Sequence, residues 1–175
     1  MRKPRCYLPG PLATGAILPA PTQTAHHLGT VLRLPTGTEL QLFDGSGGEY
    51  RGWIHDVSKR SLLIRIGEHS PTDAESPLTC HLLQAISKGD RMDYTLQKAV
   101  ELGVQQITAS FSRRSIPRLK SERLEKKRAH WQGVIISACE QSGRTRIPGF
   151  EIHNELGLAL AECDTGLKLM LDPRS

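Results

Sequence analysis

The sequence predicts an α+β protein, with a small β-barrel at the N-terminus followed by an α/β domain whose sheet is largely parallel. Short β-type runs separated by turns fill residues 1–70, whereas strand-like and helix-like segments alternate over residues 78–175. Between these parts, residues 71–77 are polar, carry two prolines and have no apolar period. We interpret this stretch as a linker between two domains.

The barrel is predicted from three runs with strand composition, residues 39–43, 50–54 and 61–66. The first two runs are separated by residues 44–48, Asp-Gly-Ser-Gly-Gly. Glycines in such a connection can take the positive φ that tight hairpins require. Regular short strands with alternating burial are typical of a small barrel.

The second part begins with a buried strand at residues 78–86, and a second strand follows at residues 105–111. Between them, residues 92–103 are predicted to form a helix with one apolar stripe. The stripe consists of Met92, Leu96, Ala99, Val100 and Gly103.

A long helix is predicted next, with Ser121 as its N-cap and acidic residues in its first turns. Its buried stripe follows at helical spacing: Leu124, Arg128, Trp131, Ile135 and Ala138. A shorter helix at residues 155–163 and a last strand at residues 167–171 complete the predicted order. Ligands of such sheets bind beyond the carboxyl ends of the strands, and the predicted loops there, residues 87–91 and 112–118, are rich in Lys and Arg.

Composition narrows the classes of partner and site. Lys and Arg outnumber Asp and Glu by 23 to 18, which favours a polyanionic partner without identifying one. The four cysteines are far apart and form no C-x-x-C pair, so they are predicted to be reduced thiols. No apolar run suits a signal peptide or a membrane span, and the predicted location is the cytoplasm, with no membrane partner.

The histidines and tryptophans bear on possible metal sites, the core and base stacking. His26 and His27 are adjacent, and in a strand they would point to opposite faces, so no metal site is predicted there. Trp53 and Trp131 are interpreted as core anchors. No stacking platform for single-stranded nucleic acid is predicted, because aromatic residues make up only 5% of the chain.

Three segments carry a resemblance to a known family: Phe43-Asp44-Gly45, residues 97–104 (Gln-Lys-Ala-Val-Glu-Leu-Gly-Val) and residues 140–144 (Glu-Gln-Ser-Gly-Arg) with Pro148 shortly after. Residues 4–7 and 27–34 also fit. Together, in order and over nearly the whole chain, they resemble the bacterial 16S ribosomal RNA (uridine-N3) methyltransferases.

The resemblance implies a PUA-like barrel that helps to hold RNA over residues 1–70, and a methyltransferase domain of the SPOUT class over residues 78–175. That class binds S-adenosylmethionine in a C-terminal trefoil knot and works as a homodimer, here on 16S rRNA of the small subunit. The family's G-P-E-G-G loop and L-G-x-R-x-L-R segment are expected beyond Arg174. We therefore expect this chain to lack the knot segment and to bind the cofactor weakly, and a non-catalytic RNA-binding module is the alternative.

Two smaller departures from the family pattern occur. Ala109 stands where relatives often have proline, and Arg113 stands where an acidic residue is common. A nucleotide-binding enzyme of ordinary Rossmann type is disfavoured, because no G-x-G-x-x-G follows the strand at residues 78–86.

Methylation of uridine at N3 requires loss of the N3 proton, so the protein must orient the base and stabilise its developing anion. The candidate catalytic residues are Arg144, Glu140 and Gln141. Lys, Arg and His side chains supply the candidate RNA contacts, because cations, and guanidinium forks above all, bind phosphate and uracil oxygens. These are Arg5, His27, Arg33, Lys88, Arg91, Lys98 and Arg114. By the resemblance, Leu171 and Asp172 belong to one wall of the cofactor pocket.

Structural alternatives remain open for several of these residues. Arg91 and Arg144 could cap helices or pair with Asp90 and Glu140, and Glu140 with Gln141 could form a solvated helix end. Lys98 is three residues from Glu101 and could form an ordinary helical ion pair with it.

Overall fold

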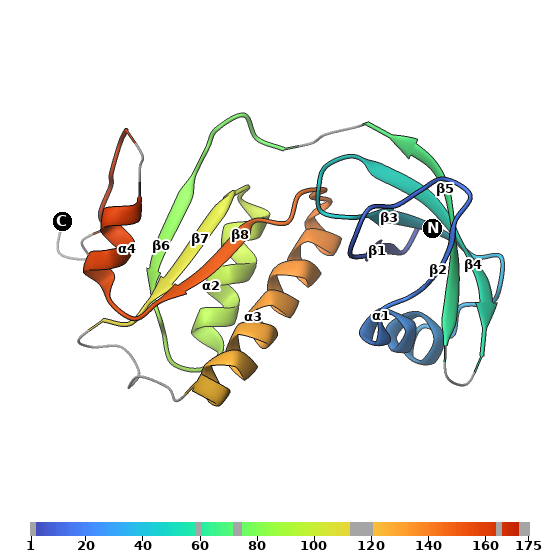
Figure 1. Cartoon of the computed structure of the whole chain (residues 1–175), viewed down its shortest axis with the longest axis horizontal. Helices are drawn as coiled ribbons and strands as arrows, with labels where there is room; N and C mark the ends of the chain where they lie inside the picture. The colour runs from blue at the N-terminus through green and yellow to red at the C-terminus, as the bar shows by residue number, and fades with distance from the viewer. Residues whose placement is uncertain (1–2, 59–60, 72–74, 113–120, 164–165, 172–175) are drawn as a thin grey trace. The chain divides into compact units, whose positions relative to one another are not determined.

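The computed structural model describes residues 3–58, 61–71, 75–112, 121–163 and 166–171 (Figure 1). It contains two compact units. The first comprises Met1–Pro77 and Ile135–Ile147, and the second comprises Leu78–Val134 and Pro148–Ser175. A strand-rich N-terminal sheet and a parallel-strand α/β part confirm the predicted fold class.

The first unit is built on a five-stranded sheet in the order β1-β3-β4-β5-β2. Its strands are β1 (Arg5–Tyr7), β2 (Ile17–Pro19), β3 (Glu39–Phe43), β4 (Glu49–Val57) and β5 (Leu62–Ser70). β1 pairs with β3 in parallel, and the other neighbours are antiparallel. The β3–β4 hairpin and its turn at residues 44–48 are confirmed, with positive φ at three turn glycines. The core between these strands includes Leu40, Leu42, Ile54 and Ile64.

Two helical turns precede β3. The expectation that His26 and His27 lie in a strand is wrong, because both residues lie in these turns. α1 (Thr22–His26) runs directly into η1 (His27–Val31), a π-helical turn. Both histidines are exposed, while Leu28 is fully buried and anchors the turn in the core. Arg33 follows the turn with a φ of +52°.

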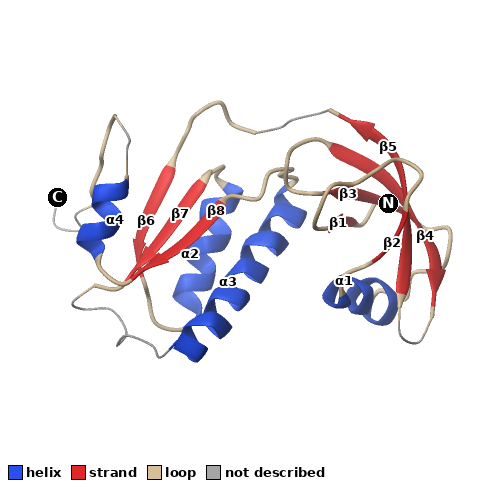
Figure 2. Cartoon of the chain, viewed as in Figure 1, coloured by secondary structure: helices blue, strands red, loops and turns tan. Residues whose placement is uncertain are grey.

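The second unit contains a parallel three-stranded sheet in the order β6-β7-β8. Its elements are β6 (His81–Ala85), α2 (Asp90–Glu101), β7 (Gln106–Ser110), α3 (Ser121–Ser142), β8 (Gly149–His153) and α4 (Leu156–Glu162). α2 and α3 run alongside the sheet in Figure 2, and α4 contacts all three strands. Burial of Met92, Leu96, Ala99 and Val100 confirms the predicted stripe of α2. α3 continues from the second unit into the first, where its last turns belong.

One prediction about the end of the chain is wrong, and one strand was missed. The strand predicted at residues 167–171 is irregular in the structure, and β8 has no counterpart in the predicted order. A strand forms only where a neighbouring strand accepts its hydrogen bonds, and residues 167–171 pair with none of the described strands. Leu167 and Leu171 are accordingly 76% and 97% exposed.

The two tryptophans differ in their surroundings. Trp131 is buried as predicted, with its ring edge-on to Phe150 at a centroid distance of 6.1 Å. Trp53 is only half-buried, and the Arg65 guanidinium lies 5.0 Å from the centre of its ring. Among the described helices, none combines the length and the apolar character that a membrane span requires.

Candidate functional site

The three candidate catalytic residues lie in the first unit, at the C-terminal end of α3 and in the turn after it. Gly143 ends the helix with a φ of +89°, and its N–H donates to the carbonyl oxygen of Cys139 at 3.1 Å. This left-handed conformation suits glycine and closes the last helical turn. It turns the chain so that Arg144 points back into the unit while Gln141 stays exposed.

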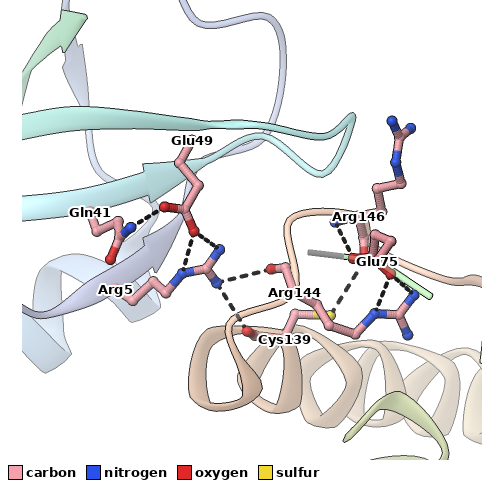
Figure 3. Close-up of polar contacts among 7 residues, drawn as sticks. All are labelled: Arg5, Gln41, Glu49, Glu75, Cys139, Arg144 and Arg146. Atoms are coloured by element: carbon pink, nitrogen blue, oxygen red, sulfur yellow. Dashed lines mark hydrogen bonds and ion pairs between the residues drawn. The ribbon is translucent and has the colours of Figure 1, made fainter. Parts of the chain in front are cut away.

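Arg5 of β1 binds the end of α3 (Figure 3). Its Nη1 donates to the carbonyl oxygens of Cys139 at 3.1 Å and Arg144 at 2.9 Å. Its Nε and Nη2 donate to Oε1 of Glu49 at 3.2 and 2.7 Å, and Glu49 also accepts a hydrogen bond from Gln41. A cation is favourable at this position, because helix C-termini carry unpaired carbonyls and partial negative charge.

Arg144 makes the second ion pair of this network (Figure 3). Its Nε and Nη2 lie 2.9 and 2.7 Å from Oε2 of Glu75, and both side chains are at most 10% exposed. The other oxygen of Glu75 accepts a hydrogen bond from the backbone N–H of Arg146 at 3.2 Å. Of the alternatives drawn from the sequence, Arg144 therefore adopts an ion pair, but with Glu75 rather than with Glu140.

Glu140 is partly buried and faces β1, where its Oε1 accepts a hydrogen bond from the backbone N–H of Tyr7 at 3.0 Å. Burial raises the pKa of Glu140, and the Tyr7 hydrogen bond together with the charges of His27 and Arg5 opposes this change. The carboxyl group is thus an internal group of the first unit and no solvated helix end.

The turn after α3 is held against the β3–β4 turn. Arg146 forms β-bridges with Gly45 and Ser46, and the N–H of Ile147 donates to the carbonyl oxygen of Gly45 at 3.2 Å. Residues from four sequence regions, β1, the β3–β4 hairpin, the segment around Glu75 and the end of α3, thereby fix the backbone around Arg144.

The remaining candidate RNA contacts fall into two groups. In the first unit, Arg5 is buried in its ion pair, so a direct phosphate contact would require this network to open, whereas His27 and Arg33 are exposed. In the second unit, Lys88 and Arg91 are exposed at the start of α2. These assignments stay predictions.

Lys98 has the structural role considered above. Its Nζ lies 2.5 Å from Oε2 of Glu101, and the ion pair raises the pKa of Lys98 and lowers that of Glu101. Leu171 is almost fully exposed, and it does not line the cavity bounded by Lys3, Gln41 and His69 or the one bounded by Thr14, Trp53 and Arg65. Arg114 and Asp172 lie outside the described residues.

Sequence reasoning missed the two carboxylates that organise this site. Glu49 follows a glycine-rich turn and Glu75 lies in the polar segment interpreted as a linker, and both positions look solvated in the sequence. The one available signal was the pair of arginines, since buried arginines require partners.

Comparison with known proteins shows the family of this chain. A sequence model of the RNA methyltransferase domain matches residues 74–175, and one of the RNA methyltransferase PUA domain matches residues 21–67. The chain belongs to the RNA methyltransferase family. The family resemblance drawn from the sequence is confirmed.

Curated relatives in this RNA methyltransferase family bear the name ribosomal RNA small subunit methyltransferase E. The Buchnera aphidicola protein from Schizaphis graminum is 34% identical over 87% of this chain, and the Bacillus subtilis protein is 27% identical over 75%. The chain spans 61% and 52% of the lengths of these two relatives.

Solved structures of methyltransferases share the fold. A Legionella pneumophila methyltransferase in complex with the bound cofactor SAM superposes with a TM-score of 0.94 at 39% identity, over 99% of this chain and 72% of that one. The ribosomal RNA small subunit methyltransferase E of Neisseria gonorrhoeae, bound to S-adenosyl methionine, gives a TM-score of 0.81 at 44% identity, over 86% of this chain and 63% of that one.

Proposed function

We propose that this protein transfers the methyl group of S-adenosylmethionine to N3 of a uridine in the 16S rRNA of the small ribosomal subunit. The observation that carries the proposal is the match of residues 74–175 to the RNA methyltransferase domain. It is supported by the fold shared with a SAM-bound methyltransferase over 99% of the chain. Residues 1–70 would hold RNA, residues 78–175 would belong to the catalytic domain, and residues 71–77 would link them.

The reaction removes one proton and adds one methyl group at the same nitrogen. Uridine N3 carries a proton at neutral pH, so a base must accept it as the new N–C bond forms and the sulfonium leaves as a thioether. The protein contributes by orienting the base and by stabilising its developing anion. S-adenosylmethionine supplies the methyl group when bound.

Among the three candidate catalytic residues, Glu140 suits proton acceptance best. Burial raises the pKa of this carboxyl group, and a general base is most effective when its pKa approaches the working pH. The Tyr7 N–H fixes one carboxyl oxygen. Arg144 is engaged with Glu75, so we assign it to shaping the turn, and exposed Gln141 is the candidate for a hydrogen bond to uracil.

Leu171, the described member of the expected pocket wall, is 97% exposed and lines neither described cavity. The proposal for S-adenosylmethionine therefore relies on the family and on the SAM-bound relatives. By the same family resemblance, we propose that the protein is a homodimer and acts in the cytoplasm. Sedimentation of the purified protein would test the dimer.

Labelled methyl transfer tests the function directly. The complete natural protein is incubated with small ribosomal subunits and S-adenosylmethionine carrying a labelled methyl group, and the RNA is digested to nucleosides for mass spectrometry. We expect label in N3-methyluridine, which has lost its pairing N–H and therefore also stops reverse transcription. Label on another atom or in another RNA would contradict the proposed specificity, and RNA binding without any methyl transfer would favour the non-catalytic alternative.

A matched pair of variants tests the role of Glu140. Glu140→Gln keeps an acceptor for the Tyr7 N–H but cannot take a proton, and we expect about a 100-fold or larger loss in the methylation rate. Glu122→Gln changes an exposed carboxylate at the other end of α3, which is paired with Lys126, and should leave the rate unchanged. Equal rates in the two variants would remove Glu140 from the mechanism.

A further inference from the structure

A groove of about 480 Å³ crosses the ends of β3, β4 and β5 in the first unit. Its volume lies in the range of about 300–1,000 Å³ that is usual for small-molecule sites. The residues that decide its chemistry are Lys3, Gln41, Tyr50, Arg51, Glu68 and His69. None of these residues has a part in the site at the end of α3 except Gln41, which binds Glu49.

The rings of Tyr50 and His69 lie side by side in this groove. Their centroids are 4.6 Å apart and their planes are inclined at 47°. Tyr50 is half-buried and packs against the core, while His69 is exposed, so the outer face of the imidazole is open to a ligand. Gly48 makes this arrangement possible, because a Cβ at that position would lie 2.3 Å from Nε2 of His69.

Charges around the groove are largely paired. Lys3 lies 2.7 Å from Glu39, Arg51 lies 3.9 Å from the same carboxylate, and Glu49 is paired with Arg5. Glu68 has no ion pair among the described residues, and its carboxylate is an acceptor at the groove wall. The groove lining thus contains three carboxylates, Glu39, Glu49 and Glu68, and two cations, Lys3 and Arg51. It has no excess of positive charge, and it suits a neutral, flat, hydrogen-bonding group better than a phosphate.

We infer that this groove binds one unpaired base of the RNA, stacked on His69 and hydrogen-bonded at its edge to polar groups such as Glu68. The inference rests on the proposed function in that the partner is RNA, and it adds a site that reads a base at a place separate from the methylated uridine. Stacking of a base on an aromatic side chain contributes about 1–3 kcal/mol, which corresponds to about 5- to 150-fold in affinity.

The test uses two short labelled RNA probes and the 175-residue chain. One probe is oligouridylate, which has little structure of its own, and the other is an abasic ribo-oligomer of equal length and charge. The variants are His69→Ala, His69→Phe, which retains a flat ring, and His55→Ala, which removes an exposed histidine of β4 outside the groove. Anisotropy gives the affinity at several salt concentrations, and thermal melting checks that each variant is folded.

We expect His69→Ala to lower the affinity for oligouridylate about tenfold without changing the slope of log affinity against log salt. His69→Phe and His55→Ala should bind like the unchanged protein, and all four proteins should bind the abasic probe equally. An unchanged affinity for His69→Ala, an equal loss on the abasic probe, or a shallower salt slope would overturn the inference, the last two by indicating a phosphate contact.

These outcomes separate the inference from the proposed function. If the unchanged chain binds oligouridylate and the His69 variants bind equally well, the groove is not a base site while RNA remains the partner. If the unchanged chain binds neither probe, the inference is overturned, and methyl transfer to small subunits then decides the proposed function independently. Failure of His69→Phe to restore the affinity lost in His69→Ala would exclude stacking as the mode of binding.

Discussion

Arg5 combines two electrostatic roles in one side chain. It neutralises Glu49, and the same guanidinium supplies hydrogen bonds to two carbonyl oxygens at the end of α3. Five N–H donors in a planar fork make this combination available to arginine and not to lysine. An ion pair of this kind adds little net stability, but removing one partner leaves a buried charge behind.

Removal of Arg5 is therefore expected to be costly. In Arg5→Ala, Glu49 and the carbonyls of Cys139 and Arg144 lose their donor, and we expect the free energy of unfolding to fall by about 3 kcal/mol. The control is Arg51→Ala, whose 66% exposed side chain lies 3.9 Å from its carboxylate and should contribute less than about 0.5 kcal/mol. Urea unfolding measures both, and similar losses would refute a special role for Arg5.

At Arg33 the backbone conformation predicts that a substitution raises the free energy of unfolding, unlike the substitution of Arg5. Its φ of +52° lies in the left-handed region, which costs a residue with a side chain about 1 kcal/mol and costs glycine almost nothing. Arg33→Gly should therefore raise the free energy of unfolding by up to about 1 kcal/mol, while Arg33→Ala should not. Thermal and urea unfolding of the two variants gives the comparison, and a loss of stability in the glycine variant would contradict it.

Glu140 predicts a dependence of stability on pH. Burial raises its pKa above the ordinary value of 4.5, so the folded protein holds this proton more tightly than the unfolded chain. The stability from this group is present below pH 4.5 and is lost as pH rises through the raised pKa. Glu140→Gln cannot lose a proton, so its stability relative to the unchanged protein should increase between about pH 4 and about pH 7. Urea unfolding at both pH values tests this, and a constant difference would show that burial costs the carboxylate nothing.

At the residue scale, the sequence placed Glu140 and Arg144 at the end of an apolar helix but could not show their contacts. Arg144 is buried and Glu140 is partly buried, and their catalytic roles stay predictions. Their partners could not be predicted, because Glu75 is 69 residues from Arg144 and Tyr7 is 133 residues from Glu140. Such pairings are decided by tertiary packing, and no local pattern records them.

Among the elements, α3 has the clearest design. Its interior contains Gly133 and its end is formed by Gly143, and a Cβ would meet no atom within 4 Å at either position. The two glycines differ only in backbone, since Gly143 has a φ of +89° and Gly133 is helical. Substitutions at Gly133 test the preference of a residue for the helix interior, and substitutions at Gly143 test how the helix ends.

Alanine at the two positions should have opposite effects. Gly133→Ala should stabilise the protein by about 0.5–1 kcal/mol, because alanine loses less backbone entropy in a helix. Gly143→Ala should destabilise it by about 1 kcal/mol, because the left-handed conformation is strained for alanine. Chemical unfolding of both variants gives the difference, and effects of the same sign would mean that α3 does not end at Gly143 in solution.

Elements with a clear apolar period were predictable, and the shortest strands were not. β3, α2 and β7 match the predicted segments within two residues at each end, because alternation or a helical stripe extends over their length. β1 and β2 have only three residues each, too few to show a period. β8 pairs in parallel with β7, whereas residues 167–171 pair with none of the described strands and form no strand despite their apolar pattern.

On the scale of the whole molecule, positive charge is divided between the two units. The formal net charge is +5, and the exposed candidate contacts comprise Arg33 in the first unit and Lys88 with Arg91 in the second. Each cation that binds a phosphate releases condensed counterions, which makes the affinity fall as salt rises. The salt dependence of the affinity therefore counts the phosphate contacts made by each unit.

If both units bind one RNA, variants in each should act additively on this count. We expect Arg33→Gly and Arg91→Ala each to lower the slope of log affinity against log salt by about 0.9, and the double variant to lower it by about 1.8. Lys126→Ala, which removes an exposed cation already paired with Glu122 at 2.7 Å, is the control and should leave the slope unchanged. Filter binding with small-subunit rRNA fragments measures these slopes. A slope that responds to Arg33→Gly alone would confine RNA binding to the first unit, and a slope that none of the variants changes would show that these arginines contact no phosphate.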